Sequence, residues 1–178
     1  MKISDLIGET TEYDKKVALE EKRPKSWLKS VSAFANCIGG VLIFGVSDND
    51  ELFGLSDVKR VSEVISEQIK QRLDPVPQTV LEIRHEDGKD FILLKVSAGQ
   101  ETPYYYVADG NRIAFVRIGN ESVPADANRL RQLVLKGSGK TYDSLPSRYM
   151  FSELSFAKLR SVYKMRTGTD LSDSDFIS

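Results

Sequence analysis

Residues 32–46, SAFANCIGGVLIFGV, constrain the fold more than any other part of the sequence. Before the two glycines, apolar side chains recur with the spacing of one helix face, and Pro24 stands at the first turn of that pattern. They are Trp27, Val31, Phe34, Ala35 and Ile38. After the glycines, residues 41–46 form a run without polar side chains, which predicts a strand covered on both faces. The segment therefore predicts a helix that turns back onto a buried strand.

The pair Gly39 and Gly40 has two explanations that the sequence leaves open. A left-handed cap at Gly39 lets the helix end and fold back against its strand, and Gly45 then marks the close approach of another backbone. Alternatively, the bare backbone admits a ligand closely. A phosphate loop of the Walker type is excluded, because its glycines precede a helix, whereas these precede a strand. We take Asn36, Gly39, Gly40 and Gly45 as one structural motif.

Three further helices are predicted from caps and apolar periodicity. Ser56 or Asp57 caps the first, which ends at the sequence DPVP. Asp126 caps the second, and Gly137 closes it. The third begins at Ser155.

Strands are predicted in the segments between these helices. The sequence LFGL at 52–55 predicts a short strand antiparallel to residues 41–46, and the turns EDGKD and ADGNR predict hairpins over 79–97 and 104–118. The chain lacks the repeated strand–helix alternation of a doubly wound fold. We therefore expect an α+β fold, with a mixed or mostly antiparallel sheet and helices packed largely on one face.

The length of 178 residues favours one compact domain with an appendage. We expect a domain over 1–140, followed at 141–178 by a linker and the start of a helical region that belongs to a longer chain. The longest apolar run has about six residues, too few for a membrane span or the apolar core of a signal peptide. A cytoplasmic location without membrane association is expected.

The sequence holds one cysteine and one histidine, Cys37 and His85. This composition excludes disulfide frameworks, zinc sites of the usual Cys/His kind, and Ser-His-Asp or Cys-His catalytic sets. Any catalysis would depend on carboxylates, hydroxyls and lysines.

The net charge is −1, but basic side chains concentrate near the N-terminus. Residues 15–29 hold six basic side chains against two acidic ones, which fits either a solvated helix face or a patch that faces phosphates. Arg117, at the end of a predicted strand, could present its guanidinium to a phosphate. The candidate phosphate-contacting residues are Lys16, Lys22, Arg23, Lys25, Lys29 and Arg117.

Acidic residues form a second candidate group. Glu9 and Asp14 lie close together in sequence, and Asp48 and Asp50 occupy the turn after the apolar strand. Two or three of these carboxylates could converge and hold Mg²⁺ or Mn²⁺, which activates water for phosphodiester cleavage. The alternative is that they are ordinary turn and cap residues.

Several segments, in this order, resemble the Schlafen/AlbA-like DNA-binding domain family over residues 8–135. They are GETTEYDKK, SAFANCIGGVLIFGVSDND, the pair GL at 54–55, TPYYY and FVRIGNES. The resemblance implies an α+β DNA-binding module, often the N-terminal part of a larger bacterial regulator. Some Schlafen relatives cleave structured RNA with a three-carboxylate metal site. That pattern matches Glu9, Asp14 and Lys16, with Asp48 or Asp50 as the third acid; Asp14 replaces a Glu, and Lys15 replaces a Phe.

The first hypothesis is a nucleic-acid-binding domain of a bacterial transcriptional regulator, which contacts the phosphate backbone of DNA or RNA. It needs no cofactor. The alternative is a Mg²⁺- or Mn²⁺-dependent endoribonuclease that uses Glu9, Asp14 and Asp48. A third option is a protein-interaction domain. A homo-oligomer and contacts with C-terminal domains of the same longer chain are further expected partners.

Overall fold

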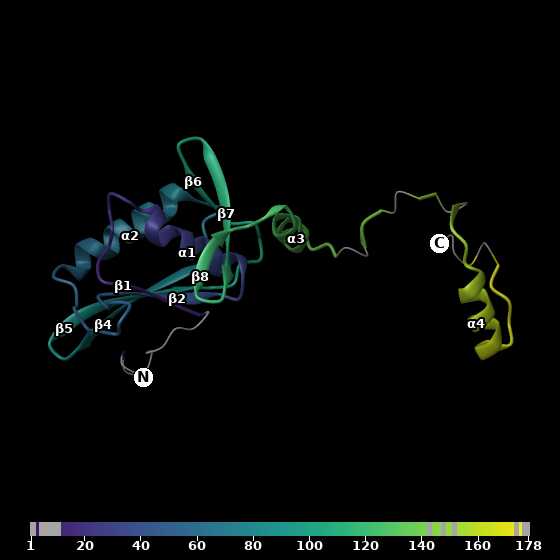
Figure 1. Ribbon diagram of the computed structural model, residues 1–178, viewed down its shortest axis with the longest axis horizontal. Coiled ribbons are helices and arrows are strands. Elements are labelled where there is room, and N and C mark those ends of the chain that lie inside the picture. Colours follow the sequence, from purple (N-terminus) through teal and green to yellow (C-terminus); the bar gives the residue numbers. More distant parts are fainter. Residues whose placement is uncertain are drawn as a thin grey trace. The chain divides into compact units, whose positions relative to one another are not determined.

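The computed structural model describes residues 3, 12–141, 144–146, 149–150, 153–172 and 175. The chain divides into two compact units, Met1–Tyr142 and Asp143–Ser178. The helices and strands of the first unit are coloured from purple to green in Figure 1. In chain order they are β1 (Tyr13–Lys16), α1 (Lys25–Asn36), β2 (Gly40–Phe44), α2 (Val58–Arg72), β3 (Leu73–Asp74), β4 (Thr79–Glu86), β5 (Lys89–Val96), β6 (Tyr105–Ala108), β7 (Asn111–Ile118), β8 (Glu121–Pro124) and α3 (Ala127–Gly137).

The strands form two four-stranded sheets. The first has the order β1-β2-β5-β4, in which β1 runs parallel to β2 and the other neighbours are antiparallel. The second has the order β3-β6-β7-β8 and is antiparallel throughout. One mixed and one antiparallel sheet, with α1 and α2 packed on the same face of the first sheet, confirm the predicted α+β class.

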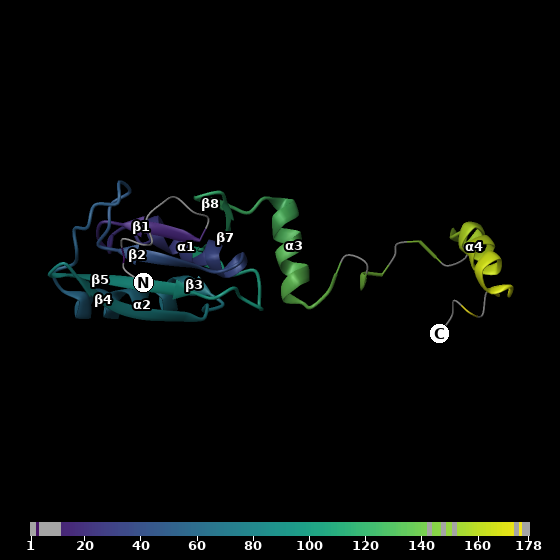
Figure 2. The same ribbon diagram turned by 90° about the horizontal axis from the view of Figure 1, so that it is seen from below.

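Helix α1 lies between the two sheets and carries the centre of the core (Figures 1 and 2). Its buried side chains Trp27, Val31 and Phe34 share one cluster with residues of β2, β5 and α2 on one side and with Phe115 of β7 on the other. Because α1 packs against both sheets, nine of its twelve residues are buried, and the other three, Lys25, Ser26 and Lys29, form a short stripe in its first two turns. The stripe of α1 that is not buried becomes important for the site described below.

Strand β2 is covered on both faces, as its unbroken apolar run predicts. Leu42 and Phe44 join the cluster around α1, whereas Ile43 packs with Phe91 and Leu93 in a separate cluster on the opposite face. Alternate residues of a strand point to opposite faces, so a strand with two covered faces needs apolar side chains at every position.

The double-glycine corner is explained by the packing around it. Gly39 has φ +89°, and a Cβ at this position would lie 2.8 Å from the carbonyl oxygen of Val96. A Cβ at Gly40 would collide with the ring of Phe34. Both positions therefore require glycine for the close approach of α1 to the first sheet.

Asn36 ties the end of α1 to the second sheet. Its amide nitrogen donates to the carbonyl oxygens of Tyr104 and Phe115, both at 2.9 Å, and its Oδ1 accepts from the Tyr104 backbone N–H at 2.7 Å. The side chain is only 3% exposed. A buried amide with three hydrogen bonds is fully engaged, so Asn36 holds the fold together at this point.

The hairpins β4–β5 and β6–β7 confirm the two predicted turns, and Asp57 and Asp126 cap α2 and α3 through their side chains. Two expectations were wrong in detail. Ile38 is 67% exposed, because α1 ends at Asn36, two residues before the apolar pattern does. Residues 52–55 form only isolated bridges, Val46 with Leu52 and Leu55 with Asp90, instead of a strand.

The second unit contains α4 (Ala157–Thr167), which ends at Gly168 in a left-handed conformation. None of its residues is buried. Among the residues that the structure describes, no helix is long and apolar enough to span a membrane.

Candidate nucleic-acid interface

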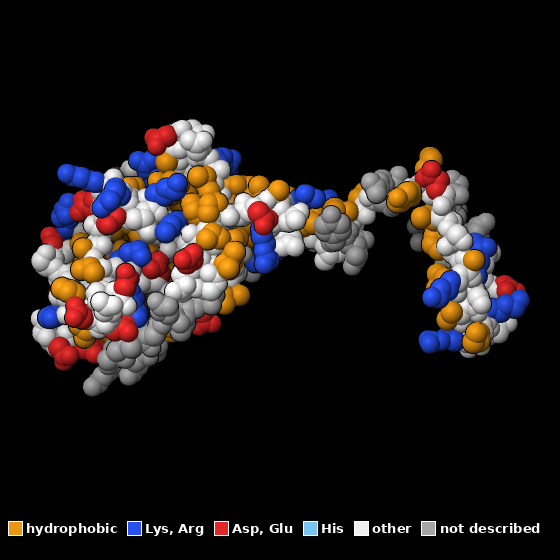
Figure 3. Space-filling model, viewed as in Figure 1, with side chains coloured by type: hydrophobic (Ala, Val, Ile, Leu, Met, Phe, Trp, Pro, Cys, Tyr) orange, Lys and Arg blue, Asp and Glu red, His pale blue; other side chains and the backbone are white. Residues whose placement is uncertain are grey.

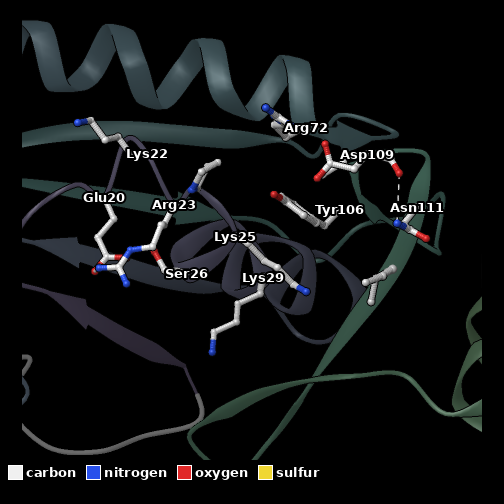
Figure 4. A pocket seen from close by; sticks show the side chains of 13 residues that line it. Glu20, Lys22, Arg23, Lys25, Ser26, Lys29, Arg72, Tyr106, Asp109 and Asn111 are labelled. Carbon is white, nitrogen blue, oxygen red and sulfur yellow. Dashed lines mark hydrogen bonds and ion pairs between the residues drawn. The ribbon is translucent and has the colours of Figure 1, made fainter.

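A cleft of about 710 Å³ runs beside the exposed stripe of α1 (Figure 4). We call it the α1 cleft. It is bounded by the loop that leads into α1, by α1 itself, by the C-terminal end of α2 and by the β6–β7 hairpin. Its lining residues are Glu20, Lys22, Arg23, Pro24, Lys25, Ser26, Lys29, Arg72, Tyr106, Ala108, Asp109, Asn111 and Ile113.

The burial of α1 directs its cations into this cleft. Trp27, Leu28 and Val31 are at most 1% exposed, and they fix the rotation of the helix. Lys25 and Lys29 are four residues apart and therefore lie on one stripe, which is the stripe that the core does not cover. Pro24 occupies the N-cap, and the chain just before it presents Lys22 and Arg23 to the same cleft.

The cleft holds five cationic side chains, Lys22, Arg23, Lys25, Lys29 and Arg72, against two carboxylates, Glu20 and Asp109. Only Arg23 is paired, with Glu20 at 3.5 Å, and its side chain is 81% exposed. Exposed pairs of this kind contribute little. Within the described part of the chain, the other four cations form no ion pair. The cleft therefore has a positive potential that nearby carboxylates leave uncompensated.

Figure 3 shows Lys and Arg side chains gathered over the region where Figure 1 places α1, α2 and the loop before α1, with acidic side chains between them. Lys22, Arg23, Lys25 and Lys29 are thus brought together, in agreement with their grouping from the sequence.

The opposite side of the cleft comes from the β6–β7 hairpin and differs in charge. None of the lining residues that the hairpin presents is a cation, but Arg72 from the end of α2 lies beside them (Figure 4). They are Tyr106, Ala108, Asp109, Asn111 and Ile113. Tyr106 is 6% exposed, and its hydroxyl points into the cleft (Figure 4). Asn111 donates from its amide nitrogen to the Asp109 carbonyl oxygen at 3.2 Å.

Sequence reasoning did not select Arg72 or Asn111 as site residues. The turn ADGNR predicts the hairpin, but no local signal shows that this hairpin lies beside α1. That placement results from contacts between residues far apart in sequence, such as those of Asn36 with Tyr104 and Phe115.

Lys16 and Arg117 do not line the α1 cleft; they belong to a second group of charges beside α1. Asp14 accepts hydrogen bonds from Lys16 Nζ, at 2.7 Å, and from the Ser30 hydroxyl. Arg117 donates to the Ser122 hydroxyl and to the Tyr13 carbonyl oxygen, both at 3.2 Å. We call this group the Asp14–Arg117 cluster.

The guanidinium of Arg117 is held on several sides. Ser122 also donates to the Ser30 hydroxyl at 3.2 Å, and the guanidinium carbon lies 5.0 Å from the centre of the Phe34 ring. Burial lowers the pKa of Arg117, and the negative charge of Asp14 opposes that shift. The arginine thus joins β1, β7, β8 and α1, and its charge is matched by a nearby carboxylate.

The acidic residues of the nuclease hypothesis are only partly placed. Glu9 lies outside the described residues. Asp14 is engaged in the Asp14–Arg117 cluster, and Asp48 is exposed in the loop after β2. Lys15 and Asp50 form an ion pair. Among the residues that the structure describes, no three His, Cys, Asp or Glu side chains are grouped so that they could hold a metal ion. The three-carboxylate site stays a prediction.

Comparison with known proteins identifies the family. The model of the family described as Schlafen, AlbA_2 matches residues 8–126. The chain belongs to this family. The resemblance that the sequence segments indicate is thereby confirmed, and no curated protein matches the chain.

Two solved structures are similar to this Schlafen AlbA_2 domain. One is the N-terminal domain of a protein from Nitrosomonas europaea named as related to the ATP-dependent DNA helicase RecG, with a TM-score of 0.50 and 23% identity over 68% of this chain and 88% of that chain. The other is the DIP2311 protein from Corynebacterium diphtheriae, with a TM-score of 0.53 and 15% identity over 95% of this chain and 37% of that chain. At these identities, the similarity shows a shared fold.

Proposed function

We propose that the first unit is a nucleic-acid-binding domain that contacts the phosphate backbone through the α1 cleft. The observation that carries the proposal is the local excess of cations, five against two carboxylates, in a chain whose net charge is −1. Four of these cations have no carboxylate partner among the described residues. Phosphates of a nucleic acid would supply the missing negative charge.

Family membership supports this proposal, because Schlafen AlbA_2 domains are associated with nucleic acids. The name of the similar Nitrosomonas europaea protein also refers to a DNA helicase. We extend the proposal to the N-terminal domain of a larger bacterial transcriptional regulator. In its support, the Nitrosomonas europaea domain is the N-terminal part of its protein, and this chain spans only 37% of the DIP2311 chain.

Binding through phosphates predicts a steep dependence on salt. Each neutralised phosphate releases condensed counterions, so four contacts correspond to a slope of about −3 to −4 in log affinity against log salt. Between about 50 and 200 mM salt, the affinity should then fall roughly 100-fold. The measurement is fluorescence anisotropy of a labelled oligonucleotide titrated with the full chain.

Paired substitutions assign the binding to the cleft. Lys25→Ala combined with Lys29→Ala should reduce the magnitude of the salt slope by about 2 and weaken binding about tenfold or more at low salt. Lys136→Ala is the matched control, since Lys136 is exposed on α3 and does not line the cleft. If binding does not depend on salt, or if the control weakens it as much as the cleft pair does, the assignment is wrong.

A further inference from the structure

The two sides of the α1 cleft differ in charge, because most of the cations lie on the α1 side. Lys22, Arg23, Lys25 and Lys29 come from α1 and the loop before it. The hairpin side presents neutral polar groups and one carboxylate, Asp109. The fifth cation, Arg72, ends α2 and lies beside Tyr106 and Asp109, because Leu73 pairs with Tyr106 (Figure 4). Four of the five cations therefore attract phosphates to the α1 side, and Asp109 repels them from the tip of the hairpin.

Both sides of the cleft also offer hydrogen-bonding groups that the described residues leave unused, Tyr106 on the hairpin side and Ser26 on α1. The Tyr106 side chain is 94% buried, its hydroxyl points into the cleft, and it donates no hydrogen bond to any described residue (Figure 4). Ser26 lines the same cleft, and its hydroxyl is buried without a partner in the described part of the chain. Buried polar groups are normally satisfied, so the buried Ser26 hydroxyl leaves a polar position in this cleft that a ligand could satisfy.

Apolar side chains also line the hairpin side of the cleft. Ala108 and Ile113 are half-buried on the hairpin side, next to Tyr106 and Asn111. A nucleobase has flat apolar faces and an edge of donors and acceptors, and it carries no charge. Asn111 can donate to and accept from such an edge, and the Asp109 carboxylate can accept from an amino group of a base.

We propose that the hairpin side of the α1 cleft holds the base of an unpaired nucleotide, while the phosphates of the same strand lie along α1. The preferred ligand is therefore single-stranded nucleic acid. In a duplex only the edges of the stacked bases are accessible, in the grooves, so the cleft could not enclose a whole base between α1 and the hairpin. The cleft volume of about 710 Å³ lies within the range of small-ligand sites and suits one or two nucleotides.

This inference rests on the proposed function, and the experiment separates the two. Three fluorescein-labelled probes of equal phosphate number are titrated with the full chain: a mixed-sequence single strand, the same backbone with abasic sites, and a duplex. The mixed-sequence strand should bind about fivefold more tightly than either of the others, the factor that one net hydrogen bond contributes. All three affinities should fall as the salt concentration rises.

Two conservative variants locate the base. Asn111→Ala and Tyr106→Phe should each reduce the preference for the strand with bases to twofold or less, with abasic binding unchanged. Lys25→Ala should weaken all three probes in parallel. Asn128→Ala is the matched control, because Asn128 is exposed on α3 and lies outside the cleft lining. Thermal unfolding of each variant shows that the fold is kept.

The outcomes are distinguishable. If no probe binds, or if Lys25→Ala has no effect on any probe, the proposed function itself is wrong. If all three probes bind with equal, salt-dependent affinity, phosphate binding stands and the base subsite is overturned. A preference for bases that survives both Asn111→Ala and Tyr106→Phe would overturn the assignment to the hairpin side.

Discussion

The α1 cleft and the Asp14–Arg117 cluster are both cationic, and both are built on α1, where Lys29 and Ser30 are consecutive residues. Their cations nevertheless meet opposite environments. Lys25 and Lys29 face an open cleft and form no ion pair within the described residues. Arg117 has a carboxylate nearby, two oxygen acceptors and an aromatic ring around its guanidinium.

This difference shows that a count of basic residues does not identify a binding surface. A basic residue is available to bind an external anion only if the fold places no carboxylate beside it. Asp14 lies two residues from Lys16 but about a hundred from Arg117 along the chain, and only the arrangement of β1 beside α1 and β7 brings Asp14 and Arg117 together. A cation without such a partner can bind an external anion without breaking an ion pair, and among the described residues Lys25 has only the Phe115 ring, 6.0 Å from its Nζ.

The largest effect on stability is expected at Arg117. Arg117→Ala removes hydrogen bonds to Ser122 and Tyr13 and leaves Asp14 with one cation fewer, so it should lower the free energy of unfolding by about 2–3 kcal/mol. Arg117→Lys should recover only part of this, because an ammonium cannot reproduce the planar fork or its contact with Phe34. Urea unfolding monitored by circular dichroism measures both values.

The same variant tests whether the two regions are separate. The folded Arg117→Ala protein should bind an oligonucleotide within about twofold of the unsubstituted chain, since Arg117 does not line the cleft. Unchanged stability together with a large loss of binding would instead place Arg117 among the phosphate-contacting residues.

A smaller loss of stability is expected from a substitution at Asp14. Asp14→Asn keeps the shape of the side chain but removes the charge that Lys16 and Arg117 face, and we expect about 1 kcal/mol of destabilisation. The double variant with Arg117→Ala should be less destabilised than the sum of the two single effects, because both substitutions act on one network. Strict additivity in urea unfolding would show that the two side chains are energetically independent.

The sequence was sufficient for the parts of this molecule that depend on local patterns. The helix–glycine–strand segment, the two hairpin turns and the caps at Asp57 and Asp126 follow from periodicity and turn chemistry. It was also sufficient to group Lys22, Arg23, Lys25 and Lys29, because one helix and its preceding loop carry them.

The sequence was not sufficient where distant segments meet. Arg72, Tyr106 and Asn111 enter the cleft from α2 and the β6–β7 hairpin, and their position depends on how the second sheet packs against α1. For the same reason Arg117 could not be distinguished from the cleft cations, since its partners lie on β1 and β8. The division of the strands into two sheets is likewise a result of long-range pairing.

The cleft lysines should matter little for folding, in contrast to Arg117. Lys25→Ala with Lys29→Ala should change the free energy of unfolding by no more than about 0.5 kcal/mol, because neither side chain has an ionic partner to lose. At low salt the change should be slightly stabilising, since like charges are removed, and it should vanish at high salt. A destabilisation comparable with that of Arg117→Ala in the same urea assay would mean that the cleft cations are structural.

The smallest effect is expected from removing a carboxylate of the cleft. This substitution should increase the affinity for an oligonucleotide, whereas removing a cleft cation should decrease it. Glu20 is the ionic partner of Arg23, and it adds negative charge where we propose that phosphates bind. Glu20→Gln should raise the affinity for an oligonucleotide about twofold at low salt, and the gain should disappear at high salt, because both side chains are exposed and screened. Glu63→Gln, on the exposed surface of α2 and outside the cleft lining, is the matched control and should leave anisotropy titrations unchanged. A loss of affinity with Glu20→Gln would mean that this carboxylate positions Arg23 for binding. The pair of Glu20 and Arg23 would then resemble the Asp14–Arg117 cluster, in which a carboxylate holds a cation, and would differ from the unpaired lysines of the cleft.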